Sequence, residues 1–478
     1  MKKTKVYVVY TGGTIGMAPE DISNPASPLV PKSLKELQVY MPLDKVDIEF
    51  GEYSFSPPLD SSDVQLKHWH EIAEVIEKVY DEYDGFVVLH GTDTMAYTAS
   101  GLSFIFENLS KPVVVTGSQL PISAIRTDAV MNFINAIYIA GYKAFQLPRI
   151  PEVVVCFADK LLRGCRTTKV SSTQWAGFDS PNYPQLGSIG EHIIINEELL
   201  LPVPPEGKKF YLNKDLVDNI MNITIFPGIK SSQLDKLFLD DENEGIIINT
   251  FGAGNAPSGD FLTSIEKANN ANKIILNITQ CVEGMVEMGL YAASSGLLER
   301  GVVSGLDMTT EAAMAKLMWT LGTQFGDGRA TQLQISQRGE QSENLFDLRY
   351  GELSKKDKKS VSTNTVQPDG RLRLDNLSKA VVRISNLTMV GAKKGENVKI
   401  NIFMNMPRAT NDTDSSDNKC VASFEFVWDG KSQILLQDIT DRAKHILQQG
   451  EIILSVVSPD ENITFHYDGL YLALFSKA

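Results

Sequence analysis

The chain has 478 residues, of which 43% are hydrophobic and 22% charged, the proportions of a protein that folds around a core. This length predicts about two or three domains. A net charge of −14 argues against nucleic acid or an anionic membrane as the main partner. Four scattered cysteines without a CxxC pair fit a reducing compartment and no zinc site. No apolar run has the length of a signal-peptide core or a bilayer span, so we expect a cytoplasmic protein.

The first part of the chain alternates between strand and helix patterns. Short apolar runs predict strands at 5–10, 86–89, 113–116 and 152–157. Apolar residues at helical spacing predict helices at 63–83, 95–107 and 129–140. This alternation is typical of βαβ units and a parallel sheet, and predicts an α/β domain over residues 1–205.

The same alternation resumes after a proline-rich stretch at 201–205. Strand patterns at 223–226, 245–249 and 273–277 predict a second α/β domain over residues 219–350. The polar, lysine-rich stretch that follows predicts a linker at 354–370.

The patterning of the last part of the chain changes to a period of two. Strands are predicted at 380–385, 398–404, 422–428, 451–457, 463–467 and 471–475, with one helix at 439–447. We therefore expect a small all-β sandwich over residues 371–478, with a role in assembly, stabilisation or partner binding.

Two threonine-rich glycine loops follow predicted strands, TGGTIGM at 11–17 and HGTDTM at 90–95. Ligands of open α/β sheets bind outside the carboxyl ends of the strands, so we expect both loops to face one site. Hydroxyls, a carboxylate and glycines suit covalent attack on a carbonyl or amide, and neither loop has the Lys-Ser/Thr pair of a P-loop. Each loop alone could also be only a helix cap or a tight turn.

These two motifs resemble the paired signatures of the bacterial-type L-asparaginases, the threonine-dependent amidohydrolases, and in particular their cytoplasmic type I branch. Further matches follow in the family's order at 60–63 (DSSD), 115–119 (VTGSQ), 163–169 (RGCRTTK), 180–183 (SPNY) and 252–257 (GAGNAP). The resemblance covers about residues 1–350. It implies two α/β domains of asparaginase type and does not extend into the β-sandwich.

The resemblance also implies roles for individual residues. Thr14 matches the family's nucleophile, and Thr92, Asp93 and Lys169 match its second catalytic group, which activates a hydroxyl or the attacking water. Independently of the family, a desolvated lysine near other cations can lose its proton and serve as a base. Without its motif, Lys169 would be read as a solvated surface lysine.

A second set of matched residues would bind the zwitterionic substrate. Ser61 would bind its α-carboxylate, Asp93 its α-ammonium group, and the backbone at Ser118 the oxyanion. Asn255 matches a position near the substrate that relatives contribute across a subunit contact, which implies a homodimer or homotetramer. The complete substrate-binding set is Asp60, Ser61, Gly91, Thr92, Asp93, Ser118 and Asn255. No cofactor or metal is expected, because no metal-ligand spacing is present.

One position departs from the family. The loop after the nucleophile usually carries a tyrosine that orients the threonine, but residues 18–38 contain none and the nearest is Tyr40. Either another residue or subunit supplies that group, or Thr14 is activated differently.

Three functions remain open from the sequence. The leading one is hydrolysis of L-asparagine to L-aspartate and ammonia, with a minor glutaminase activity also compatible. The second is an ammonia-supplying amidotransferase subunit acting on charged transfer RNA, and the third a catalytically impaired amino-acid-binding protein. The preference for asparagine over glutamine depends on one methylene of pocket depth, which the sequence does not determine.

Overall fold

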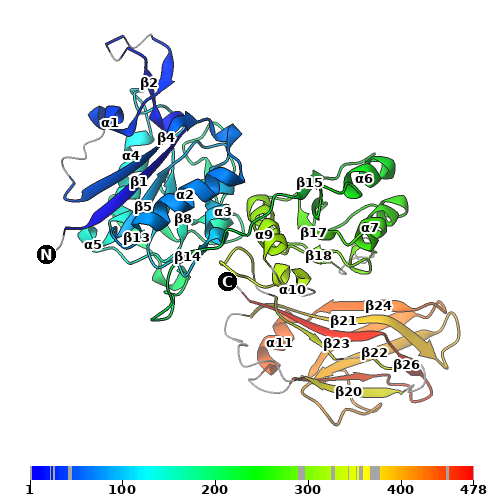
Figure 1. Cartoon of the computed structure of the whole chain (residues 1–478). Helices are drawn as coiled ribbons and strands as arrows, with labels where there is room; N and C mark the ends of the chain where they lie inside the picture. The colour runs from blue at the N-terminus through cyan, green and yellow to red at the C-terminus, as the bar shows by residue number, and fades with distance from the viewer. Residues whose placement is uncertain are drawn as a thin grey trace. The chain divides into compact units, whose positions relative to one another are not determined.

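The computed structural model describes residues 3–476 except 22, 25–26, 41–45, 289–295, 324–328, 343, 351, 355–358, 367–376 and 448–451. The chain divides into two compact units (Figure 1). Unit 1 comprises Met1–Met288 and Gly296–Gln341, and unit 2 comprises Gly289–Ser295 and Ser342–Ala478. No described helix combines the length and the apolar character needed to cross a bilayer.

Unit 1 begins with an eight-stranded sheet in the order β13-β12-β9-β8-β7-β5-β1-β4. Its strands are β1 (Lys5–Gly12), β4 (Glu49–Leu59), β5 (Gly85–Leu89), β7 (Val113–Thr116), β8 (Val153–Phe157), β9 (Lys160–Arg163), β12 (Gly187–Ile189) and β13 (Ile193–Ile195). The strands from β4 to β8 are parallel, as expected, whereas β9, β12 and β13 add an antiparallel edge. Only Ala158 and Asp159 separate β8 from β9, and so short a connection forms a hairpin, not a parallel crossover.

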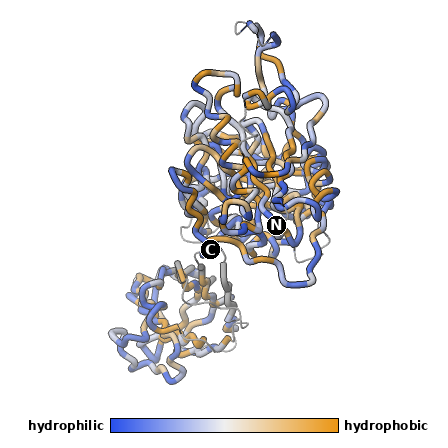
Figure 2. Tube along the Cα trace, turned by 90° about the vertical axis from the view of Figure 1, so that its left-hand side faces the viewer, coloured by the Kyte–Doolittle hydropathy of each residue, from blue (hydrophilic) through white to orange (hydrophobic). Residues whose placement is uncertain are grey.

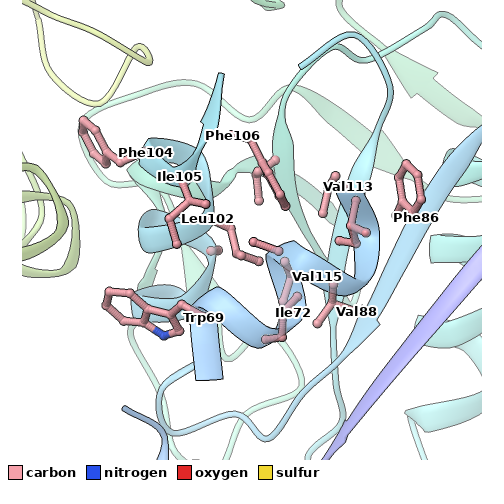
Figure 3. Packing of buried hydrophobic residues seen from close by; sticks show 14 of the residues in the cluster. Trp69, Ile72, Phe86, Val88, Leu102, Phe104, Ile105, Phe106, Val113 and Val115 are labelled. Atoms are coloured by element: carbon pink, nitrogen blue, oxygen red, sulfur yellow. The ribbon is translucent and has the colours of Figure 1, made fainter. Parts of the chain in front are cut away.

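Helices cover both faces of this sheet. On one face, α2 (Leu66–Val79) and α3 (Met95–Ile105) bury apolar side chains against β5 and β7. Figure 3 shows Ile72 and Leu102 from these helices directed towards Val88 and Val115 of the strands. The opposite face packs against α4 (Ala129–Ala140). Figure 2 accordingly shows hydrophobic segments concentrated inside unit 1 and hydrophilic segments mostly on its periphery.

A second, parallel sheet completes unit 1 in the order β15-β16-β17-β18. Its elements are β15 (Ile220–Thr224), α6 (Ser231–Phe238), β16 (Gly245–Thr250), α7 (Asp260–Asn270), β17 (Ile274–Thr279), β18 (Val303–Ser304), α9 (Thr310–Gly322) and α10 (Arg329–Gln334). Helix α9 packs on α3 of the first sheet, with the rings of Phe104 and Trp319 5.7 Å apart. The two sheets therefore share one packed interface inside unit 1.

Shorter elements connect these layers. They are β2 (Met17–Pro19), β3 (Leu29–Pro31), α1 (Leu34–Leu37), β6 (Phe106–Glu107), α5 (Tyr142–Phe145), β10 (Thr168–Lys169), β11 (Phe178–Asp179) and β14 (Tyr211–Leu212).

Unit 2 is an antiparallel β-sandwich, which confirms the expected fold class. One sheet has the order β19-β27-β21-β24, with β26 paired to β21, and the other has the order β20-β25-β22-β23. The elements are β19 (Asn344–Arg349), β20 (Val361–Val366), β21 (Leu377–Val390), β22 (Asn397–Met404), β23 (Cys420–Val427), β24 (Gln433–Asp438), α11 (Thr440–Ile446), β25 (Ile452–Val457), β26 (Thr464–His466) and β27 (Gly469–Ser476). Val382 of one sheet and Ile400 of the other are buried in one shared core.

Two strands of the sandwich lie where the sequence predicted other structure. β19 falls inside the expected second α/β domain (219–350) but pairs with β27. β20 falls inside the expected linker (354–370) but pairs with β25 along its whole length. Its sequence VSTNTV is polar, which resembles a linker, but its β-branched residues favour a strand. The described part of the sandwich thus begins near Ser342, not at 371.

Candidate active site

The first loop follows β1 and is shaped by two glycines. Gly12 and Gly13 have φ angles of 131° and 83°, which favour glycine. A Cβ atom on Gly13 would lie 2.4 Å from the Cα atom of Gly91, so the backbones of the two threonine-rich loops touch. Thr14 opens the 3-10 helix η1 (Thr14–Gly16) directly after this contact, and its side chain is half-buried. Thr14 therefore lies beside the second loop.

A third loop, which follows β4, also contacts the second loop at Gly91. A Cβ atom on Gly91 would lie 2.5 Å from the Oγ atom of Ser61. Ser61 Oγ accepts a hydrogen bond from the backbone N–H of Asp93 at 3.3 Å, and Thr94 Oγ1 donates to the Ser61 carbonyl at 2.6 Å. The strands β4, β1 and β5 are adjacent and parallel, so all three loops leave the same edge of the sheet.

Lys169 joins this cluster from outside the parallel strands. Its Nζ atom donates to Thr92 Oγ1 at 2.9 Å and to Asp93 Oδ1 at 2.8 Å. The Lys169 side chain is 21% exposed, so it is largely covered, while that of Asp93 is 66% exposed and open to a ligand. The Lys169 amine thus lies within hydrogen-bond reach of both a hydroxyl and a carboxylate, as proton transfer requires.

His90 holds the second loop from the buried interior of the protein. It is fully buried, and burial lowers its pKa to about 4, so the imidazole is neutral. Its Nδ1 atom lies 2.7 Å from the Gly91 carbonyl, which can only accept, so Nδ1 carries the proton. Nε2 therefore accepts from the hydroxyl of Thr98 at 2.9 Å, and that oxygen accepts from Trp69 Nε1–H at 3.0 Å. This chain of hydrogen bonds ties the loop to α3 and α2.

The loop after β7 lies against the same cluster. A Cβ atom on Gly117 would lie 2.3 Å from the His90 carbonyl oxygen. Ser118 is buried and donates its hydroxyl hydrogen to the Leu120 carbonyl at 2.5 Å. Asp128 accepts from the backbone N–H groups of the two residues after Ser118 and so fixes the loop.

Two of the expected substrate-binding residues have other described contacts within this chain. Asp60 caps the 3-10 helix η4 (Ser61–Asp63) by accepting from Ser62 N–H at 2.9 Å, and this hydrogen bond lowers its carboxyl pKa. Asn255 lies in a turn of the second sheet, where its backbone N–H donates to Phe251 at 2.8 Å. Among the described residues, the buried Asn255 Oδ1 has no hydrogen-bond partner. Neither side chain makes a described contact with Thr14, Thr92 or Lys169.

The segment after Thr14 forms a hairpin of β2 and β3. Neither strand contains a tyrosine. Tyr40 lies in the 3-10 helix η2 (Gln38–Tyr40) and packs against the core cluster that contains Ile15. The departure noted in the sequence is therefore also present in the fold.

Several supporting residues were not predicted from the sequence. Thr94 could have been found, because it is a third hydroxyl of the HGTDTM motif. Trp69, Thr98 and Asp128 gave no such signal, since they lie on helices or in a turn outside the quoted motifs and act only through the backbone they hold.

Four polar loops meet at one edge of the sheet, and Lys169 joins them from β10. A half-buried threonine beside a Thr-Lys-Asp cluster is an arrangement that suits an enzyme cleaving amides or esters through a hydroxyl nucleophile. Residues 5–201 match the family model "Asparaginase, N-terminal", and residues 219–332 match "Glutaminase/Asparaginase C-terminal domain". The chain belongs to the asparaginase family.

Individual relatives agree with this assignment. L-asparaginase 1 of Escherichia coli K12 is 41% identical over 328 residues, which cover 68% of this chain and 94% of that protein. The crystal structure of L-asparaginase I from Vibrio cholerae is 38% identical with a TM-score of 0.63, and the match covers 71% of this chain and 99% of that one. These relatives confirm the expected likeness to the type I branch. A glutamyl-tRNA(Gln) amidotransferase component of Pyrococcus abyssi is 32% identical over 287 residues, 55% of this chain and 60% of that one.

Proposed function

We propose that this protein is an L-asparaginase, which hydrolyses L-asparagine to L-aspartate and ammonia. The observation that carries the proposal is the contact of Gly13 with Gly91, which puts Thr14 beside a loop whose Thr92 is hydrogen-bonded to Lys169. A two-step acyl transfer needs a nucleophile and a group that activates it, and one hydroxyl beside a hydroxyl paired with an amine can supply both.

In the first step, the Thr14 hydroxyl oxygen attacks the side-chain amide carbon, and its proton passes through a neighbouring base to the leaving nitrogen. Ammonia departs and an ester to Thr14 remains. In the second step, water attacks this ester and its proton passes through Thr92 and Lys169 to the Thr14 oxygen, so the ester bond breaks and aspartate leaves. We assign the stabilisation of the negative oxygen in both steps to the main chain at Ser118, because the next two N–H groups are held by Asp128.

The ends of the substrate match the charges at the site. The exposed Asp93 carboxylate takes the α-ammonium group. Donors near Ser61, on the neighbouring loop, take the α-carboxylate. Asp93 also holds Lys169, so substrate binding and the catalytic amine are linked through one residue.

The test is a steady-state ammonia assay on asparagine and glutamine. Thr14→Ala and Thr92→Ala should each abolish ammonia release while the protein stays folded, and Thr14→Ser should retain part of it. Thr263→Ala, at an exposed threonine of α7, is the matched control and should change nothing. Full activity of the folded Thr14→Ala protein would contradict the proposal.

The same assay separates the alternatives. An amidotransferase component would release ammonia productively only with its partner protein and charged transfer RNA. The shorter match to the amidotransferase of Pyrococcus abyssi and the net charge of −14 make this the weaker candidate. An impaired binding protein would bind asparagine without turnover, and only the missing lid tyrosine supports it.

We further propose that the protein works as a homodimer or homotetramer in the cytoplasm. Ile125, Met131 and Trp175 are large apolar side chains that are 105%, 62% and 40% exposed, which suits a subunit contact. The four cysteines are unpaired, which suits a reducing compartment. Light scattering on the purified protein tests the assembly, and a monomer at working concentration would refute it.

A further inference from the structure

Residues 166–169, which end in Lys169, are attached to the second sheet of unit 1 by two side chains. Arg166, three residues before Lys169, donates from Nη1 to Asp307 Oδ2 at 2.8 Å. Thr168, the residue next to Lys169, donates from Oγ1 to Glu311 Oε1 at 2.8 Å. Arg166, Asp307 and Glu311 are all at least nine-tenths buried. Buried polar contacts of this kind have few alternative partners, so their geometry is firmly set.

Both acceptors belong to the start of α9. Glu311 lies in the first turn of that helix, and Asp307 lies in the connection before it. The N-cap Thr309 accepts from Ala312 N–H and so fixes this first turn. The start of α9 is therefore a rigid attachment point.

The same helix also packs on α3, the helix that follows the loop with Thr92. Helix α3 begins directly after the second loop, and the rings of its Phe104 and of Trp319 in α9 are 5.7 Å apart. α9 is thus hydrogen-bonded to the neighbour of Lys169 and packed on the helix that follows Thr92.

We propose that Thr168 and Glu311 are positioning residues that hold Lys169 at hydrogen-bond distance from Thr92. The proposal rests on the proposed asparaginase activity, because it assigns a role to the second sheet in that reaction. The backbone of β10 is separately held by its pairing with β11, where Lys169 is opposite Phe178. Loss of the Thr168 hydroxyl should therefore release the side-chain anchor without unfolding the strand.

The test begins with Thr168→Val, which keeps the shape of the side chain and removes only its hydroxyl. Because a displacement of about 1 Å at a catalytic group costs up to about 10²-fold in rate, we expect kcat to fall about tenfold or more with little change in KM. Thr168→Ser restores the donor and should recover most of the loss. Glu311→Gln keeps the accepting oxygen and should be mild, whereas Glu311→Leu should match Thr168→Val.

Thr320→Val is the matched control. Thr320 is a buried threonine on the same helix, but its hydroxyl bonds to the Lys316 carbonyl within α9, so this variant should keep kcat. The double variant Thr168→Val with Glu311→Leu should lose no more turnover than either single variant, because one interaction is removed in all three. An additive loss, or an equal loss in Thr320→Val, would mean general destabilisation and would overturn the proposal.

A crystal structure of Thr168→Val gives a readout that does not depend on activity. We expect the Lys169 Nζ–Thr92 Oγ1 distance to leave the hydrogen-bond range. An unchanged distance with normal kcat would refute the positioning role. Absence of ammonia release by the wild-type protein would instead refute the proposed function, so the two failures are distinguishable.

Discussion

The contact between Gly13 and Gly91 gives the sharpest prediction, because a single methyl group should separate the two threonine-rich loops. In Gly13→Ala the new Cβ atom would lie 2.4 Å from Gly91 Cα, whereas ordinary contact begins at 3.4 Å. The three nearest atoms belong to the backbone of His90 and Gly91, so no flexible side chain can yield. The loops must therefore move apart by about 1 Å, a displacement that costs up to about 10²-fold in turnover when reacting groups are involved.

The substitution also strains the backbone. Gly13 has φ 83° and ψ 175°, a region that essentially only glycine occupies, and holding another residue there costs about 1–3 kcal/mol. Alanine substitutions at two other glycines serve as controls that separate the backbone strain from the steric clash. Gly228→Ala has positive φ (98°) but no atom within 4 Å, and Gly190→Ala has neither problem.

The assay is kcat for ammonia release from asparagine together with the free energy of unfolding in urea. We expect Gly13→Ala to lose about two orders of magnitude in kcat. Gly228→Ala should lose about 1–2 kcal/mol of stability but keep its kcat, and Gly190→Ala should keep both. A folded Gly13→Ala protein with normal kcat would show that the spacing of the two loops does not control the reaction.

Other parts of the structure give three further predictions. Burial lowers the pKa of His90 from 6.5 to about 4, and only the unfolded chain binds the proton between these values. The free energy of unfolding should therefore fall by about 3 kcal/mol as the pH drops from 6.5 to about 4. Urea unfolding of His90→Asn at several pH values should lack this part of the pH dependence. Lys169→Met should lower kcat with little loss of stability, whereas Asp93→Ala should lose turnover and substrate affinity together, as isothermal titration with asparagine would detect. A chain that ends at Gln341 should stay soluble and hydrolyse asparagine. A chain that ends at Tyr350 keeps β19 without its partner β27, so we expect it to aggregate, as light scattering would detect. A 341-residue chain that folds but is inactive would show that the β-sandwich completes the site.

The loops of the site could be predicted because their signals are local. Each motif follows an apolar run of parallel-strand type, and the ends of neighbouring parallel strands necessarily share an edge of the sheet. The helix at 129–140 and the strand at 113–116 were predicted at their observed ends, since buried strands and amphipathic helices have distinct periods. The family resemblance added the roles, which periodicity alone does not give.

The edges of the fold were harder to predict. The sequence of β20 favours a linker because polar residues dominate it, although Ser362 is buried and its hydroxyl lies 3.1 Å from that of Tyr467. β24 was not predicted, and β19 was assigned to the preceding domain. Such strands are stabilised by partners far along the chain. β19 pairs with β27, but only the sequence of β27 alternates strongly between apolar and other residues.

The hydrogen bonds that hold the segment with Lys169 could not be predicted either, because they join residues far apart in the chain. Arg166 and Asp307 are 141 residues apart in the chain, and Thr168 and Glu311 are 143 apart. No local pattern encodes such pairs, and Glu311 alone resembles any acidic residue in the first turn of a helix, where it would favour the helix dipole. In the fold, however, Glu311 is buried and its pKa is raised by that burial, so its position costs stability that an exposed residue would not cost. A carboxyl group kept there at a cost, with its hydrogen bond directed to the neighbour of Lys169, is better explained by the geometry of the site than by the stability of α9.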